Sequence, residues 1–241
     1  MQCQVPAQPE PLAVDFRRSA LLIIDMQRDF LEPHGFGAAL GNDVSLLGRA
    51  VAPCKAMLEG ARAAGILVLH TREGHRPDLS DAPKTKIERG APERRIGVAG
   101  PMGRILVRGE AGHGIIADLQ PLPSEPVIDK PGKGAFYQTD LELLLRNRGI
   151  DTLLIAGVTT EVCVHSTVRE ANDRGFRCLV LGDACASYHP EFHEVGLRMI
   201  AAQGAIFGWV TTTEAVLAAL SDSQAARPAA PVETVAEVES A

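Results

Sequence analysis

The strongest indication of architecture in this chain is the segment Thr152-Leu153-Leu154-Ile155-Ala156-Gly157-Val158-Thr159-Thr160-Glu161-Val162-Cys163. Its apolar run, 152–156, predicts a parallel strand buried on both faces. A short turn follows, and the residues after it are typical of a helix start. A thiol in the first turn of a helix lies beside unpaired backbone N–H groups, which favour a thiolate and can donate to an oxyanion. Cys163 is therefore a candidate nucleophile.

Six apolar runs of this kind occur along the chain, and helical patterns separate them. The predicted strands are Ala20–Ile24, Ile66–His70, Pro126–Asp129, Thr152–Ala156, Arg177–Leu181 and Ala205–Trp209. The predicted helices are Ser45–Ala64, Thr139–Arg148, Glu161–Arg174, Glu191–Gln203 and Thr213–Leu220. Strands that alternate with helices predict an α/β fold, a three-layer α/β/α sandwich around a parallel, Rossmann-like sheet.

The two ends of the chain differ in composition from its middle. Residues 1–17 lack periodicity and predict an N-terminal extension, and residues 18–220 form the expected domain. Residues 221–241 are rich in Ala, Pro, Glu and Val, which predicts a disordered C-terminal tail. Residues 71–125 show little regular pattern, apart from a short helix or strand near 112–119. A loop of that length is more typical of a lid or a subunit contact than of a simple connection.

Composition excludes several classes of partner. With 241 residues, 46% of them apolar, the chain can bury a sizeable core. A net charge of −6 without a basic stripe argues against nucleic acid. The apolar runs are far shorter than the roughly 20 residues that span a bilayer, and the N-terminus has no signal-peptide pattern. Five cysteines without framework spacing indicate a reducing compartment. We expect a cytoplasmic protein with a small-molecule substrate and no membrane partner.

Three chemically complementary residues follow three of the predicted strands, namely Asp25, Lys130 and Cys163. Ligands of open α/β sheets bind at the carboxyl ends of strands, so we expect these side chains to meet. Asp25 would be the general base, and Lys130 would lower the pKa of the thiol. The backbone N–H groups of Cys163 and the 157–160 turn would hold the oxyanion. This pattern predicts a cysteine hydrolase of amide C–N bonds.

Simpler roles remain open for each of these residues. Cys163 could be a core residue, Asp25 could be a turn residue, and Lys130 alone could be a solvated loop lysine. His70, Glu73 and His75 follow the second strand, but they lack the spacing of a metal-ligand set, so we expect no metal and no cofactor. A non-enzymatic binding protein on the same fold is the alternative.

Three ordered motifs resemble those of isochorismatase-like cysteine hydrolases. They are the opening strand at 21–30, the lysine segment at 130–136 and the nucleophile turn at 157–164. The resemblance covers residues 18–220. It implies a six-stranded parallel sheet, the triad predicted above, and a homo-oligomer that is usually a tetramer. It also implies a cis peptide bond between Val158 and Thr159, which would direct the N–H groups of Thr159 and Cys163 at the oxyanion.

Within this family, Cys163 indicates the amidase side. Residues 70–78 lack the Asp-x-His metal signature of nicotinamidases and resemble the biuret hydrolase branch instead, as do residues 108–110, 139–143 and 169–175. Trp209 is more similar to the ureidoacrylate amidohydrolases. The resemblance implies hydrolysis of biuret to allophanate and ammonia through a Cys163 acyl-enzyme. Triuret, ureidoacrylate and N-carbamoylsarcosine stay open as substrates.

The resemblance also implies a set of substrate contacts. The expected substrate-binding residues are Phe30, Lys133, Val158, Thr160 and Gln203. Biuret is flat and neutral, so its recognition requires hydrogen bonds, for which Gln203 offers a donor and an acceptor and Lys133 offers donors. Gln203 as a helix-terminal residue and Lys133 as a loop charge are the simpler interpretations. An anionic substrate would need a cationic clamp, for which the candidates are Arg72, Arg76 and Arg108.

Overall fold

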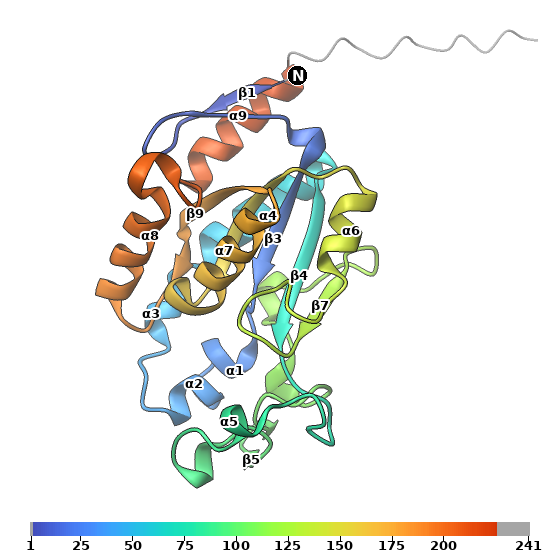
Figure 1. Ribbon diagram of the computed structural model, residues 1–241, viewed down its shortest axis with the longest axis vertical. Coiled ribbons are helices and arrows are strands. Elements are labelled where there is room, and N and C mark those ends of the chain that lie inside the picture. The colour runs from blue at the N-terminus through green and yellow to red at the C-terminus, as the bar shows by residue number, and fades with distance from the viewer. Residues whose placement is uncertain (1, 226–241) are drawn as a thin grey trace, which may run out of the picture.

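A six-stranded parallel sheet lies at the centre of the computed structural model, which describes residues 2–225 (Figure 1). The strands run in the order β10-β9-β8-β3-β4-β7, and each neighbouring pair is parallel. Their bounds are Ser19–Ile24 (β3), Leu67–Glu73 (β4), Val127–Lys130 (β7), Thr152–Val158 (β8), Arg177–Ala186 (β9) and Trp209–Thr211 (β10). The predicted three-layer α/β/α fold is confirmed.

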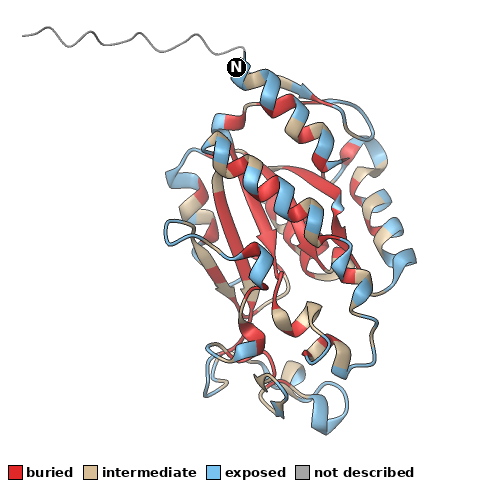
Figure 2. Ribbon diagram, turned by 180° about the vertical axis from the view of Figure 1, so that it is seen from behind, coloured by how far each residue is buried: buried red, intermediate tan, exposed pale blue. Residues whose placement is uncertain are grey.

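Helices cover both faces of the sheet, and side chains that alternate along each strand enter two separate cores. Leu21 and Ile23 of β3 pack with α4 (Val51–Ala64) and α9 (Thr213–Ala225). Ala20, Leu22 and Ile24 pack with the opposite layer. That layer consists of α6 (Leu141–Asn147), α7 (His165–Asp173) and α8 (Pro190–Ala205). The sheet between them is almost entirely buried (Figure 2), as its continuous apolar runs require.

The N-terminal segment is part of the domain, which differs from the predicted extension. Strands β1 (Cys3–Val5) and β2 (Leu12–Val14) form an antiparallel hairpin, and Val5 and Val14 are buried in the core that contains α9. Three-residue strands are too short to show a period in the sequence. Helix α9 runs to Ala225, five residues past its predicted end. The rest of the predicted tail, 226–241, lies outside the described residues.

Several element boundaries also differ from the predictions. The predicted strand 205–209 is wrong at its start, because α8 continues to Ala205 and β10 begins only at Trp209. The predicted helix 45–64 is divided into α3 (Ser45–Gly48) and α4. Strand β4 runs three residues further than predicted, to Glu73. As a result, the side chain of Glu73 lies at the carboxyl edge of the sheet.

Within residues 71–125, the stretch 74–113 folds into short elements beyond the carboxyl ends of the strands, at the bottom of Figure 1. These elements are α5 (Lys84–Ile87), the 3-10 turns Pro92–Arg94 and Ala111–His113, and the two-residue strands β5 (Ala99–Gly100) and β6 (Gly103–Arg104). The chain then returns along α4 through the 3-10 turn Ala117–Leu119. The short helices α1 (Arg28–Leu31) and α2 (Phe36–Ala39) lie at the same end. None of the described helices is long and apolar enough to cross a membrane.

Gly157 allows β3 and β8 to approach each other where the site begins. Its φ is +118°, and it is the register partner of Ile24 on β3. A Cβ atom at this position would overlap the carbonyl oxygen of Ile24 and lie 2.6 Å from the Ile24 nitrogen. Backbone atoms on a central strand cannot move aside, so this position requires glycine.

Gly157→Ala is expected to lower the free energy of unfolding by about 2–4 kcal/mol, because backbone strain and overlap with Ile24 act together. Urea unfolding followed by circular dichroism measures the loss. The matched control is Gly175→Ala, since Gly175 also has a positive φ of +79° but a Cβ there meets no atom within 4 Å. The control should lose about 1 kcal/mol. Equal losses in the two variants would contradict the importance of the Ile24 contact.

Candidate active site

The three residues predicted to act together meet at the carboxyl edge of the sheet. Lys130 Nζ lies 2.8 Å from Asp25 Oδ2, and both side chains are fully buried. The Cys163 sulfur lies within 4.8 Å of an Asp25 carboxylate oxygen. Asp25 follows β3, Lys130 ends β7 and Cys163 follows β8, so the site takes one residue from each of three strand ends.

Asp25 and Lys130 are held by further hydrogen bonds. The Thr71 hydroxyl donates to Asp25 Oδ1 at 2.6 Å. The Lys130 ammonium donates to the carbonyl oxygens of Gly132 and Lys133 at 3.0 and 2.9 Å. Burial alone lowers the pKa of Lys130, but the neighbouring charges of Asp25, Cys163 and Glu73 outweigh it, so the pKa is raised. Lys130 is therefore a permanent cation.

Cys163 lies in a π-helical turn, Thr160–Val164, and α7 begins only at His165. In this turn the N–H groups of Val162 and Val164 both donate to the carbonyl oxygen of Thr159. The Thr167 hydroxyl donates to the Cys163 carbonyl oxygen at 2.7 Å. The peptide bond between Val158 and Thr159 is cis, which confirms that expectation. The thiol thus precedes the first regular turn of α7 instead of lying within it.

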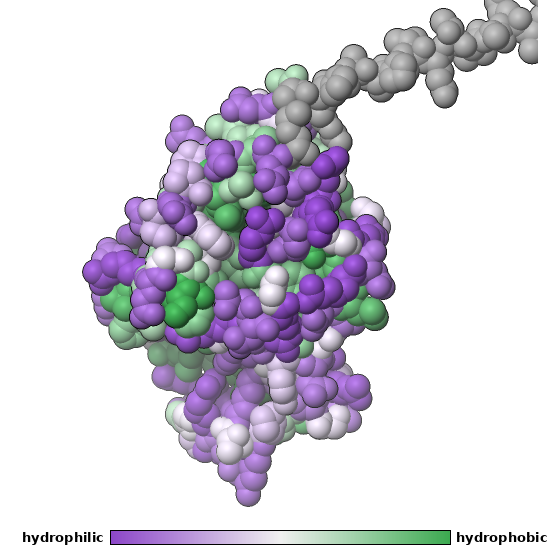
Figure 3. Space-filling model, turned by 45° about the horizontal axis from the view of Figure 1, so that its top comes forward, coloured by the Kyte–Doolittle hydropathy of each residue, from purple (hydrophilic) through white to green (hydrophobic). Residues whose placement is uncertain are grey.

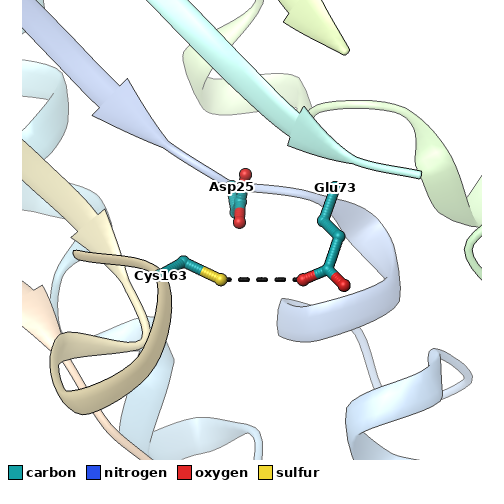
Figure 4. A group of neighbouring side chains, drawn as sticks. All are labelled: Asp25, Glu73 and Cys163. Carbon is teal, nitrogen blue, oxygen red and sulfur yellow. Dashed lines mark hydrogen bonds between the residues drawn. The ribbon is translucent and has the colours of Figure 1, made fainter. Parts of the chain in front are cut away.

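Glu73 is the site residue that sequence reasoning missed. It is fully buried at the end of β4, and the Cys163 thiol donates to its Oε2 at 3.6 Å. Figure 4 shows the sulfur directed at this carboxylate, with Asp25 on the adjacent strand end. Gln27 fixes the Glu73 backbone, since its side-chain oxygen accepts from the Glu73 N–H at 2.7 Å. Extending the second predicted strand to Glu73 would have placed it at the same edge as Asp25.

Two more lysines neutralise Glu73. Lys133 Nζ donates to both of its carboxylate oxygens at 2.8 and 2.9 Å, and Lys86 Nζ lies 2.7 Å from Oε1. Burial by itself raises the pKa of Glu73, but Lys133, Lys130 and Lys86 reverse the effect and lower it to about 2. Lys86 comes from α5 and also donates to the Pro131 carbonyl oxygen at 2.6 Å. The 71–125 segment therefore contributes a cation to the site.

Burial of Cys163 favours its neutral thiol form in the unliganded chain, whereas the sequence indicated a helix start that favours a thiolate. Burial raises its pKa well above the usual range. Lys130 lowers the thiol pKa as expected, but Asp25 and Glu73 raise it again. The prediction considered only the helix start and the one lysine, whereas the folded chain adds a second carboxylate and removes water.

The five predicted substrate-binding residues differ in where the structure places them. Lys133 contacts Glu73 as described, and the buried Thr160 shares a 2.8 Å hydrogen bond with His193 Nδ1. Val158 is buried at the end of β8, and Phe30 is half-buried in α1. Gln203 is exposed near the end of α8, where the backbone leaves helical geometry at residues 202–204. It makes no side-chain hydrogen bond to a site residue among the described residues.

Asp25, Glu73 and Cys163 could each offer one ligand atom to a metal ion, since these atoms lie within 4.8 Å of one another. Ammonium groups already compensate both carboxylates, however: Lys130 on Asp25, and Lys86 and Lys133 on Glu73. A divalent cation would have to displace these fixed charges. The donor set is therefore better suited to proton transfer than to metal binding.

Comparisons with known proteins agree with this geometry. The family model described as isochorismatase domain matches residues 19–215. The chain is 34% identical to a ureidoacrylate amidohydrolase, RutB, of Methylorubrum extorquens over 235 residues, 92% of this chain and 91% of the relative. It is similar to the crystal structure of a cysteine hydrolase from Pseudomonas syringae pv. phaseolicola, with a TM-score of 0.75, 28% identity, and coverage of 92% and 98% of the two chains. An isochorismatase family protein from Desulfovibrio vulgaris subsp. vulgaris has a TM-score of 0.69 and 33% identity, with coverage of 87% and 99%. The chain therefore belongs to the isochorismatase family.

Proposed function

We propose that the protein is a cysteine amidohydrolase that cleaves a terminal C–N bond of a small neutral ureido compound, with biuret as the substrate. The observation that carries this proposal is the buried group of Cys163, Asp25, Glu73 and Lys130, which combines a nucleophile, proton acceptors and a fixed cation. Hydrolysis of a ureido C–N bond needs all three, because a carbonyl attached to nitrogen is a weak electrophile.

In the first half-reaction Asp25 takes the thiol proton, and the sulfur attacks the carbonyl carbon. Three lysines lower the pKa of Glu73 to about 2 and so stabilise its charge, and its carboxylate accepts N–H groups of the substrate. Backbone N–H groups of Thr159 and Cys163 would donate to the oxyanion. Asp25 then returns the proton to the departing nitrogen, the C–N bond breaks, and ammonia leaves a Cys163 thioester.

In the second half-reaction water attacks the thioester, with Asp25 again accepting a proton. Collapse of the intermediate releases the carboxylate product and returns the proton to the Cys163 sulfur. For biuret the sum is one water consumed, one ammonium released and one allophanate formed, since the released ammonia takes up the acid proton of the product. The Lys130 ammonium stays beside Asp25 through both halves, because the carbonyl oxygens of Gly132 and Lys133 accept from it and hold it in place.

The cations around the site favour a neutral substrate. Arg72 is paired with Asp129 at 2.7 Å, and Arg108 lies 3.1 Å from Asp81. Two of the three candidates for a carboxylate clamp therefore have partners already. Lys133 retains one N–H beyond the two that it donates to Glu73, which suits the second carbonyl of biuret.

Ureidoacrylate is the second candidate, because a relative with 34% identity over most of both chains carries that activity in its name. Residues 207–210, Phe-Gly-Trp-Val, favour the same assignment. Binding of its carboxylate would require exposed Arg76, or the release of Arg72 or Arg108 from its acidic partner. Replacing those arginines should then raise KM for ureidoacrylate and leave biuret turnover almost unchanged.

Ammonia release from biuret, triuret, ureidoacrylate and N-carbamoylsarcosine tests the activity and its specificity. We expect the highest kcat/KM for biuret, and a loss of at least about 10³-fold in Cys163→Ser, because serine is a far weaker nucleophile at this buried position. The matched control is Cys3→Ser, which removes a thiol outside the site and should retain full activity. Turnover of biuret that survives Cys163→Ser would rule out the acyl-enzyme.

Alkylation of Cys163 by iodoacetamide across pH tests the electrostatics without a substrate. Glu73→Gln removes a charge that raises the thiol pKa, so the titration should move to lower pH and alkylation at pH 7 should accelerate. Lys133→Met removes a charge that lowers this pKa, so it should have the opposite effect. Cys178, whose burial raises its pKa to about 12, is the internal reference. Shifts of the same sign in both variants would contradict this assignment.

A further inference from the structure

Helix α8 lies at the surface, yet one of its polar side chains points inward. Figure 3 shows polar side chains, in purple, beside apolar ones, in green, over the left of the molecule, where α8 lies in Figure 1. Glu191, Glu194 and Arg198 of α8 are exposed, as charged residues of a surface helix normally are. His193 is half-buried, and its Nδ1 atom lies 2.8 Å from the hydroxyl oxygen of the fully buried Thr160. The imidazole therefore bonds to the interior of the protein.

Both branches of the Thr160 side chain contact α8. The hydroxyl bonds to His193, and the methyl group faces Gly196, where a Cβ atom would lie 3.4 Å from it. Within residues 2–225, the bond to His193 is the only side-chain hydrogen bond of Thr160. A β-branched residue has few allowed values of χ1. Contacts at both branches therefore hold the backbone of residue 160 as well as its side chain.

Thr160 lies between the two backbone N–H groups proposed for the oxyanion. It follows Thr159 directly and is the first residue of the π-helical turn that carries Cys163. The carbonyl oxygen of Thr159 accepts from the N–H groups of Val162 and Val164, so the peptide unit before Thr160 is bonded to the rest of the turn. A change in the backbone at residue 160 would alter the angle between the Thr159 and Cys163 N–H groups.

We propose that His193 is a positioning residue, which acts through the Thr160 hydroxyl to hold the Thr159 and Cys163 N–H groups in the geometry that stabilises the oxyanion. This role rests on the proposed function, because the oxyanion belongs to the same hydrolysis. It also gives the Thr160 side chain a part in positioning, instead of the substrate contact that the family resemblance implies. The hydroxyl can donate to Nδ1 or accept from it, so either tautomer of the imidazole maintains the bond.

A positioning role and a merely structural role differ in the kinetic constant that they change. Oxyanion donors stabilise the transition state more than the bound substrate, so misplaced donors lower kcat and leave KM almost unchanged. A defect that only lowers the folded fraction reduces the amount of active enzyme, which active-site titration of Cys163 measures. The values of kcat per titrated thiol therefore separate the two roles.

Ammonia release from biuret by His193→Ala tests the role. We expect kcat per titrated thiol to fall about tenfold or more while KM changes less than about twofold. His193→Asn, whose side-chain amide can take the place of Nδ1, should restore most of kcat. The matched control is His189→Ala, which removes a histidine four residues earlier whose ring stacks on Phe192 with centroids 4.8 Å apart. A kcat for His193→Ala equal to that of this control overturns the proposal.

A double-mutant cycle with Thr160→Val tests the route through the hydroxyl. Valine keeps the methyl branch and removes the hydroxyl, so this variant should lose kcat by the same factor as His193→Ala. The double variant should lose no more than either single one, because both remove the same hydrogen bond. Independent losses that multiply to about a hundredfold would mean that His193 acts without Thr160, and they overturn the proposal.

Hydrogen exchange of the amides of residues 160–165, followed by mass spectrometry, tests the positioning without turnover. His193→Ala should exchange at least about tenfold faster there than the unchanged protein or His189→Ala, because the turn opens more often. Equal exchange in all three proteins overturns the positioning role even where biuret is hydrolysed. Faster exchange in His193→Ala supports that role, and a failure of the unchanged protein to hydrolyse any ureido compound would then count against the proposed function alone.

Discussion

The buried ion pair between Lys130 and Asp25 is the interaction on which the site depends. Both side chains are fully buried, so removing either one leaves an uncompensated charge in the interior, at a cost of about 3–5 kcal/mol. The pair connects β7 to β3 across the intervening strand β4. Because Glu73 is the register partner of Lys130, the same cation faces a second carboxylate. The strand order therefore determines the charge pattern around Cys163.

In the proposed mechanism, that charge pattern keeps Cys163 as a thiol until a substrate enters. Two carboxylates and burial stabilise the thiol, while the lysines stabilise the charge of Glu73, and the raised pKa of Lys130 keeps that lysine charged. Moving the proton from sulfur to Asp25 leaves the total charge of the group unchanged, so the step needs little reorganisation of the surroundings. A free thiolate would react with any electrophile, whereas this arrangement forms one only beside a bound carbonyl.

The strand ends were predictable from the sequence because parallel strands of apolar residues bring their carboxyl ends to one edge. Asp25, Lys130 and Cys163 follow from that rule. Glu73 was missed because the polar residues 71–73 end the apolar run, although pairing with β7 continues the strand. The thiol pKa could not be predicted, since it depends on burial and on the Glu73 carboxylate from another strand. The N-terminal hairpin was missed because its strands are too short to show a period.

The segment 160–165 contributes side chains both to the buried site and to the surface of the protein. The Cys163 thiol points at Glu73, while Glu161 and His165 line a surface groove between α7 and α8. Thr160 connects the turn to α8 through its hydrogen bond with His193. Gly196 of α8 also lies against this turn, since a Cβ atom there would be 3.4 Å from the Thr160 methyl group. Helix α8 therefore packs directly on the segment that carries the sulfur.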